Sequence, residues 1–113
     1  MSVDAAATLV ASRARELLAA RDGAAQLATI SGADPSFTMT AAYAVADELR
    51  RLRLARGERA LGYKIGFTNR GIWARYGVFE PIWGPVWDTT VERCDDARAT
   101  VSLARFAAPR LEP

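Results

Sequence analysis

The sequence predicts a mixed α/β (α+β) fold, with helices in the first half of the chain and strands in the second. Apolar residues recur at helical spacing over residues 4–22, and again from residue 38 to about residue 56. Over residues 61–68, apolar side chains instead alternate with other residues, which is typical of a strand. With 113 residues, the chain is one small domain or a piece of a larger protein.

The expected helix ends carry capping residues. The first helix is expected to end at Gly23, in the left-handed conformation that glycine adopts easily. Thr38 or Thr40 is expected to cap the second helix, and Gly57 to end it. Residues 31–36 are predicted to form a loop by composition.

The predicted strand has two unlike faces. The face expected to pack in the core carries four apolar residues: Leu61, Tyr63, Ile65 and Phe67. The other face carries Gly62, Lys64 and Gly66. Glycine inside a strand is unfavourable and often marks the close approach of a ligand, so the pattern leaves open volume beside the Lys64 ammonium. Lys64 is also the only lysine among fifteen basic residues, and lysine can change its protonation state where arginine cannot. We interpret this face as a candidate site; the alternative is a solvated lysine on an ordinary edge strand.

Three further elements are expected downstream. Asn69 can cap a short helix over residues 70–76, closed by Gly77. Residues 78–87 predict an irregular segment that lines a cleft, or tryptophans that simply pack the domain. Residues 99–106 predict another strand.

Composition excludes several classes of site. The chain has no histidine and one cysteine, Cys94, which excludes a Ser-His-Asp triad, a His-ligated zinc site and an internal disulfide. A metal site would use carboxylate or carbonyl oxygens, which favours magnesium, manganese or calcium. No apolar stretch is long enough to cross a bilayer and no secretory signal is visible, so we expect a cytoplasmic protein without a membrane partner.

The basic residues include one local cluster, although the net charge is only +2. The cluster consists of Arg50, Arg51, Arg53, Arg56 and Arg59. Such a cluster is more often a solvated helix end than a nucleic-acid site, and no nucleic-acid motif accompanies it. We therefore expect no nucleic-acid partner; salt-dependent retention on DNA would support that alternative.

Three segments resemble a known family: residues 62–68 (Gly-Tyr-Lys-Ile-Gly-Phe-Thr), 76–78 (Tyr-Gly-Val) and 81–84 (Pro-Ile-Trp-Gly). They resemble the N-terminal part of the hydratase/decarboxylase branch of the fumarylacetoacetate hydrolase superfamily, which includes 2-keto-4-pentenoate hydratase and 4-oxalocrotonate decarboxylase. The resemblance implies the N-terminal mixed helix–strand region of that fold, without its C-terminal β-rich body. Residues 1–113 are then expected to be a single N-terminal domain or a fragment.

The resemblance also implies roles for individual residues. Lys64 would be catalytic, near an oxyanion or a migrating proton, and Gly62, Gly66 and Thr68 would bind substrate. Glu112, at the end of a plausible strand and followed by Pro113, matches the first member of a Glu-x-Glu metal-binding pair. The full-length enzyme would bind magnesium or manganese, and this chain by itself none. At one position the sequence departs from the family: Ile82 stands where many family hydratases have an acidic residue.

The implied activity is that of a metal-dependent hydratase, a lyase acting on a 2-hydroxypenta-2,4-dienoate or 2-oxo acid in aromatic catabolism. The alternatives are decarboxylation of an oxalocrotonate-type dioic acid, hydrolysis of an acylpyruvate, and a non-catalytic interaction stub. The 113-residue chain alone is expected to be inactive. The expected partners are a small 2-oxo acid or dienol and further copies of the protein in a homo-oligomer.

Overall fold

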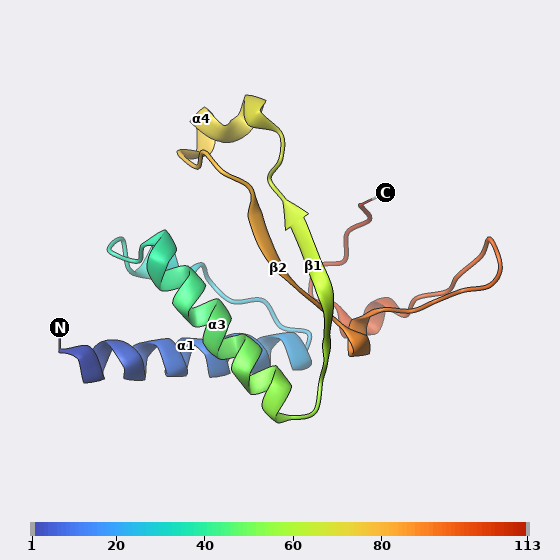
Figure 1. The fold of residues 1–113 in the computed structure, drawn as a ribbon, viewed down its shortest axis with the longest axis horizontal. Coiled ribbons are helices and arrows are strands. Elements are labelled where there is room, and N and C mark those ends of the chain that lie inside the picture. The colour runs from blue at the N-terminus through green and yellow to red at the C-terminus, as the bar shows by residue number, and fades with distance from the viewer. Residues whose placement is uncertain (1, 113) are drawn as a thin grey trace. The chain divides into compact units, whose positions relative to one another are not determined.

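The computed structural model describes residues 2–112, which divide into two compact units (Figure 1). Residues 2–52 and 94–112 form the first unit, and residues 53–93 form the second. The long helix α3 therefore begins in the first unit and ends in the second. None of the helices in the described range combines the length and the apolar character that crossing a bilayer requires.

Two long helices dominate the first unit, as the sequence predicted. Helix α1 spans Val3–Asp22 and helix α3 spans Met39–Ala55. Ser2 caps α1, since its Oγ accepts a hydrogen bond at 3.2 Å from a backbone N–H of the first turn. Thr38, and not Thr40, caps α3 in the same way, also at 3.2 Å. Each helix contributes one buried apolar residue among those described, Ala14 on α1 and Val45 on α3, at 0% and 3% exposure.

The first helix ends at Asp22, as predicted, but the left-handed residue lies one position later than predicted. Gly23 has φ −87° and is not left-handed; Ala24 takes that conformation, with φ 49°. The N–H of Ala25 then donates to the carbonyl of Ala20 at 2.8 Å, and the N–H of Ala24 donates to Arg21. These are the two hydrogen bonds of a Schellman motif, which satisfies the last carbonyls of the helix.

Two other predictions for this unit are wrong. The expected loop at residues 31–36 begins with a single helical turn, α2, over Ile30–Ala33. The expected strand at residues 99–106 is a 3₁₀ turn, η3, over Leu103–Arg105. Alternating apolar residues form a strand only beside a partner strand, and the one sheet in the described part of the chain pairs two strands of the second unit.

The second unit is a β-hairpin with a helical connection. Strand β1 (Ala60–Gly66) pairs antiparallel with strand β2 (Ile82–Trp87). The connection contains a 3₁₀ turn, η1 (Arg70–Ile72), and a helical turn, α4 (Trp73–Tyr76), and a second 3₁₀ turn, η2 (Asp88–Thr90), follows β2. Six of the ten residues of the segment predicted to be irregular therefore form a strand. Its prolines did not prevent this, because both strands of a two-stranded sheet are edge strands, where proline is tolerated.

The ends of the connection follow the sequence prediction closely. Asn69 Oδ1 accepts a hydrogen bond from the Gly71 N–H at 2.9 Å, and Gly77 closes α4 in the left-handed conformation, with φ 63°. Gly57 likewise follows α3 with φ 94°. At both positions glycine accommodates a backbone conformation that other residues adopt only with strain.

The predicted core face of β1 is not buried. Leu61, Tyr63 and Ile65 are 56%, 60% and 62% exposed, and Trp83 on β2 is 50% exposed. The rings of Tyr63 and Trp83 meet edge to face, with centroids 5.3 Å apart, so the two strands cover each other's aromatic side chains in part. Alternation correctly predicted two faces, but in a two-stranded sheet neither face is covered by a second layer of the same unit.

A cluster of charged side chains closes the open end of the hairpin. Glu58, just before β1, is 6% exposed and accepts two hydrogen bonds from Arg53, at 2.7 and 3.0 Å. Arg56 donates a third at 2.5 Å, and the hydroxyl of Thr89, just after β2, a fourth. The guanidinium of Arg53 also lies over the ring of Trp87, 4.5 Å from its centroid. These contacts connect the start of β1, the end of β2 and the end of α3.

Candidate functional site

The register of the hairpin surrounds Lys64 with glycine. Directly opposite residues of an antiparallel pair share a face, and Lys64 pairs with Gly84. On its own strand, Gly62 and Gly66 lie two residues away on the same face. Three of the nearest positions around Lys64 therefore have no side chain. An open hollow of about 270 Å³ lies here, lined by Lys64, Gly66, Ile82, Trp83, Gly84 and Pro85.

The ammonium of Lys64 lies beside Gly66. A Cβ placed on Gly66 would be 3.7 Å from Lys64 Nζ and 3.9 Å from Ile82 Cγ1. A Cβ on Gly62 or Gly84 would meet nothing within 4 Å. The space at Gly66 thus has a cation on one side and an aliphatic side chain on the other, and a branched side chain at this position would occupy it.

Four residues that line this hollow were not predicted as parts of the site: Ile82, Trp83, Gly84 and Pro85. Gly84 was noted as part of the Pro-Ile-Trp-Gly segment and Ile82 as a departure from the family, but neither as a neighbour of the Lys64 strand face. Their positions depend on the register between β1 and β2, because Gly84 reaches Lys64, and Ile82 reaches Gly66, only across the strand pair. A hairpin prediction with that register would have revealed them.

Thr68 is not brought to the hollow. Strand β1 ends at Gly66, and Phe67 then takes a left-handed conformation with φ 57°, which ends the alternation of faces before Thr68. A bulky residue in this region is strained, at a cost of about 1–2 kcal/mol. Its conformation is supported by neighbours: the Phe67 carbonyl accepts from Trp73 Nε1 at 2.9 Å, and its ring meets Tyr76 edge to face.

Glu112 lies in the other unit, outside any helix or strand. The expected strand near it is absent, and Pro113 lies outside the described residues. Residues 2–112 contain no group of three or more Asp, Glu, His or Cys side chains that could hold a metal ion. The described side chains therefore do not by themselves fit a divalent metal site.

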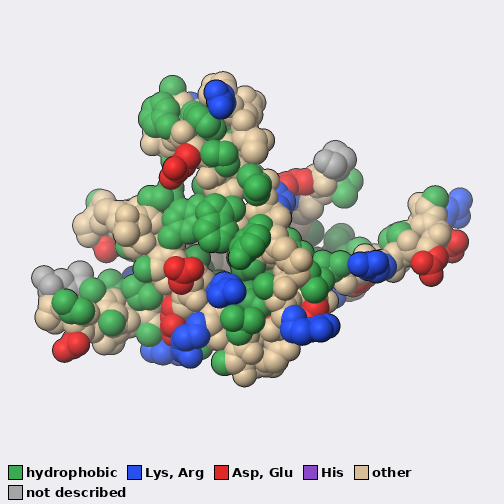
Figure 2. Space-filling model, viewed as in Figure 1, with side chains coloured by type: hydrophobic (Ala, Val, Ile, Leu, Met, Phe, Trp, Pro, Cys, Tyr) green, Lys and Arg blue, Asp and Glu red, His purple; other side chains and the backbone are tan. Residues whose placement is uncertain are grey.

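The arginine cluster is largely paired with carboxylates. Arg53 and Arg56 both bind Glu58, Arg51 binds Glu48, and Arg59 binds Asp88 at 3.3 Å. The visible face in Figure 2 accordingly shows acidic as well as basic side chains and no continuous basic area. The hydrogen bonds from Arg53 hold the pKa of Glu58 far below its usual value, with smaller contributions from Thr89 and Arg56, so Glu58 is ionised at neutral pH. Four of the five arginines of the cluster therefore have carboxylate partners within the chain.

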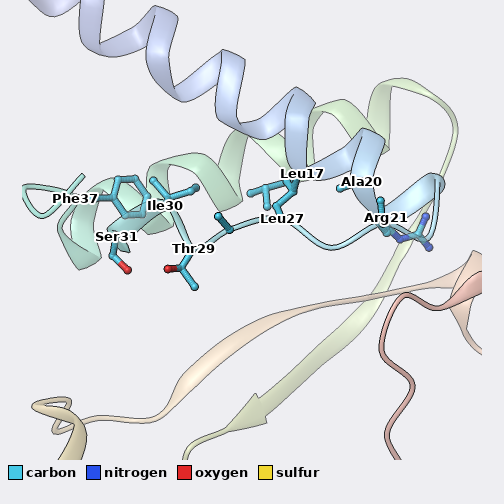
Figure 3. Close-up of a pocket in the computed structure, with 10 residues that line it drawn as sticks. Leu17, Ala20, Arg21, Leu27, Thr29, Ile30, Ser31 and Phe37 are labelled. Atoms are coloured by element: carbon cyan, nitrogen blue, oxygen red, sulfur yellow. The ribbon is translucent and has the colours of Figure 1, made fainter. Parts of the chain in front are cut away.

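A larger hollow, of about 500 Å³, lies in the first unit, between the end of α1 and the segment that leads to α3 (Figure 3). Its walls are mostly aliphatic and aromatic, with Leu17, Leu27, Ile30 and Phe37 among them. Among the described residues, Arg21 is the only charged side chain that lines it, and it pairs with Asp22 at 2.9 Å. It lacks the acid–base or metal-binding groups that catalysis needs, so we take the hollow beside Lys64 as the candidate site.

Comparison with known proteins finds relatives in the family that the sequence resembles. No family model matches the sequence. The chain is 38% identical over 93 residues to a 4-oxalocrotonate decarboxylase from a Pseudomonas species, covering 76% of this chain and 35% of that protein. It is 31% identical over 103 residues to 2-hydroxyhexa-2,4-dienoate hydratase from Comamonas testosteroni, covering 91% of this chain and 39% of that protein. The fold matches 4-oxalocrotonate decarboxylase from Pseudomonas putida G7, complexed with magnesium and adipate, with a TM-score of 0.69 and 30% identity, over 73% of this chain and 31% of that one.

The chain matches the N-terminal part of the hydratase/decarboxylase branch of the fumarylacetoacetate hydrolase superfamily. This confirms the resemblance and the mixed α/β fold class inferred from the sequence. The chain spans a little over a third of the length of these curated relatives. The roles of Lys64, Gly62, Gly66, Thr68 and Glu112 in this branch of the superfamily stay predictions.

Proposed function

We propose that the protein containing this chain is a metal-dependent hydratase, a lyase that acts on a 2-hydroxypenta-2,4-dienoate or a related 2-oxo acid in aromatic catabolism. One observation carries the proposal: Lys64 lies on a strand face where Gly62, Gly66 and Gly84 leave room for a ligand. The similarity to hydratases and decarboxylases of this superfamily supports it. Residues 1–113 would form the N-terminal domain of this protein.

Lys64 would act on the anionic oxygens of the substrate. Hydration of the dienol, and loss of the distal carboxylate of an oxalocrotonate-type dioic acid as carbon dioxide, both place negative charge on the oxygen at carbon 2. An ammonium beside Gly66 can donate a hydrogen bond to that oxygen, or to the adjacent carboxylate, and such a preorganised donor is typically worth about 3 kcal/mol in a water-poor site. The glycines would admit the substrate carbon chain, and Thr68 would contact only a substrate that extends past the end of β1.

The proposed metal ion, magnesium or manganese, needs ligands beyond those that residues 2–112 bring together. Glu112 would contribute one carboxylate, and a single carboxylate does not make a magnesium site. We therefore derive no step through the metal, and we propose that the 113-residue chain alone neither binds it tightly nor turns over substrate. A homo-oligomeric, cytoplasmic enzyme is part of the same proposal.

A decarboxylase is the second candidate. It is favoured by the 38% identity and by the TM-score of 0.69, both of which refer to 4-oxalocrotonate decarboxylases. The stabilisation of charge at the oxygen of carbon 2 is common to both reactions, so Lys64 would have the same role in either. Hydrolysis of an acylpyruvate would also use it.

Turnover assays separate these activities. The protein is expressed from its complete reading frame and supplied with magnesium. We expect loss of the ultraviolet absorbance of 2-hydroxypenta-2,4-dienoate without release of carbon dioxide. Carbon dioxide from an oxalocrotonate-type dioic acid would instead establish the decarboxylase, and pyruvate from an acylpyruvate the hydrolase. A folded, metal-loaded protein that is inactive on all three would leave the interaction stub and refute the enzyme proposal.

A further inference from the structure

The hollow on the glycine face combines one cation with an aliphatic wall. Lys64 is the only charged side chain that lines it in the described part of the chain. Ile82 faces it from the other strand, with Cγ1 3.9 Å from the Cβ position of Gly66. Both groups border the space at Gly66, so a ligand bound there touches both.

We propose that this hollow selects 2-oxo acids with a single carboxylate and a short apolar tail over dicarboxylates, and that Ile82 determines this selectivity. The inference rests on the proposed function, because it assumes that the ligand is a 2-oxo acid held at its anionic end by Lys64. The carbon chain then extends along Ile82. A second carboxylate placed against Ile82 would lose water to a side chain that offers no hydrogen bond, which is costly, whereas an alkyl or vinyl tail has no such cost.

The arginines that precede β1 already have carboxylate partners: Arg53 and Arg56 bind Glu58, and Arg59 binds Asp88. Arg70, four residues after β1, does not line the hollow and lies over the ring of Trp73, 5.5 Å from its centroid. An acidic side chain at position 82 would pair with the lysine or move protons, and isoleucine can do neither. The side chain at this position therefore changes the hollow from a charged one to an amphipathic one.

A matched pair of ligands tests the inference. The probes are 2-oxohexanoate and 2-oxoadipate, which have six carbons each and differ in the distal carboxylate. Dissociation constants are measured by calorimetry on the protein from its complete reading frame, without turnover. We expect the wild-type protein to bind 2-oxohexanoate at least about tenfold more tightly than 2-oxoadipate. This is the discrimination that an apolar contact of this size provides.

Variants of Ile82 assign the selectivity to that residue. Ile82→Leu keeps an aliphatic wall and is expected to keep the preference. Ile82→Arg supplies a partner for the distal carboxylate and is expected to reverse it, and Ile82→Gln to reduce it. Because Ile82 is 44% exposed on an edge strand, these changes are compatible with folding, which circular dichroism checks. If Ile82→Arg misfolds, the ratio of the two dissociation constants in the wild-type protein and in Ile82→Gln still tests whether Ile82 determines the selectivity.

Each outcome is informative. A wild-type preference for 2-oxoadipate, or a ratio that is the same in Ile82→Arg and Ile82→Leu, overturns the inference even if the enzyme is active. Preferential binding of 2-oxohexanoate that depends on Ile82 supports it even if no turnover is found, in which case the proposed function fails alone. Binding of neither ligand overturns the inference.

Discussion

Glu58 offers a sharp test of how the hairpin is held together. Its carboxylate accepts four hydrogen bonds from three side chains, of which Arg53 supplies two, and both residues are over 90% buried. Glu58→Gln keeps the shape of the side chain and removes its charge. The Arg53 guanidinium then stays buried beside the Trp87 ring, with a neutral amide in place of the carboxylate.

The expected cost is set by this buried cation. Losing one charged partner of a buried pair costs several kcal/mol, and hydrogen bonds to charged groups contribute about 1.5–3 kcal/mol each. Because glutamine still accepts one hydrogen bond from Arg53, we expect the free energy of unfolding to fall by about 2–3 kcal/mol. Urea denaturation followed by tryptophan fluorescence measures it, since Trp87 is 3% exposed and in contact with Arg53.

The pair Glu48–Arg51 is a matched control. Its two hydrogen bonds have the same two-pronged geometry, both at 2.7 Å, but Arg51 is exposed to solvent. Exposed ion pairs contribute little, so Glu48→Gln should change stability much less than Glu58→Gln. Equal losses in the two variants would refute the view that burial makes the Glu58 cluster important.

The acid stability of the hairpin follows from the same cluster. The pKa of Glu58 is lowered from 4.5 in the folded chain, chiefly by Arg53, so its contribution is complete above pH 4.5 and is lost as the pH falls below that value. In the wild-type chain we expect the free energy of unfolding to decrease between neutral pH and about pH 3. The decrease should be shallower in Glu58→Gln, which has no charge to lose; parallel pH profiles would contradict the assignment.

Three further predictions concern the proposed active site. Lys64→Ala should lower kcat about 100-fold or more, and Lys64→Arg should not restore it, because a guanidinium is larger and does not release its proton; wild-type rates in Lys64→Arg would remove Lys64 from the chemistry. Gly66→Val should preserve the strand but raise the KM, because its side chain would enter the space between Lys64 Nζ and Ile82 Cγ1; an unchanged KM in the folded variant would show that substrate binds elsewhere. In the protein from its complete reading frame, Glu112→Gln should weaken magnesium binding by about 2 kcal/mol in calorimetry, while the 113-residue chain should show no micromolar binding. Unchanged magnesium affinity in Glu112→Gln would remove Glu112 from the metal site. Micromolar magnesium binding by the 113-residue chain would refute the proposal that the site is split.

Local signals in the sequence were sufficient for the helices and for the start of the hairpin. The bounds of α1, α3 and β1 agree with prediction to within one or two residues, because each is set by short-range chemistry. Apolar spacing marks their length, and side-chain caps or left-handed glycines mark their ends. The placement of Lys64 between two glycines on one strand face also followed from alternation alone.

Long-range features could not be read in this way. The pairing of Lys64 with Gly84 depends on the register of β2, which lies beyond an intervening helical connection. The Glu58 cluster joins residues from three elements. Arg53 was interpreted as part of a solvated basic cluster, because helical spacing does not predict a partner such as Glu58 that lies beyond the end of α3. The expected strand at residues 99–106 failed for a related reason, since alternation cannot supply a partner strand.

The exposure of the apolar face of β1 follows from how a strand buries its residues. Alternation over residues 61–66 shows that the two faces differ, but burial requires a second layer, and a two-stranded sheet provides none. Tyr63 and Trp83 shield each other in part and remain half exposed or more. The glycine face has little apolar surface to bury, so it can stay open to a small ligand at low cost in stability. This difference explains why the hollow beside Lys64 can form within the hairpin itself, from β1, β2 and their register, even though the hairpin's apolar face lacks a covering layer in its own unit.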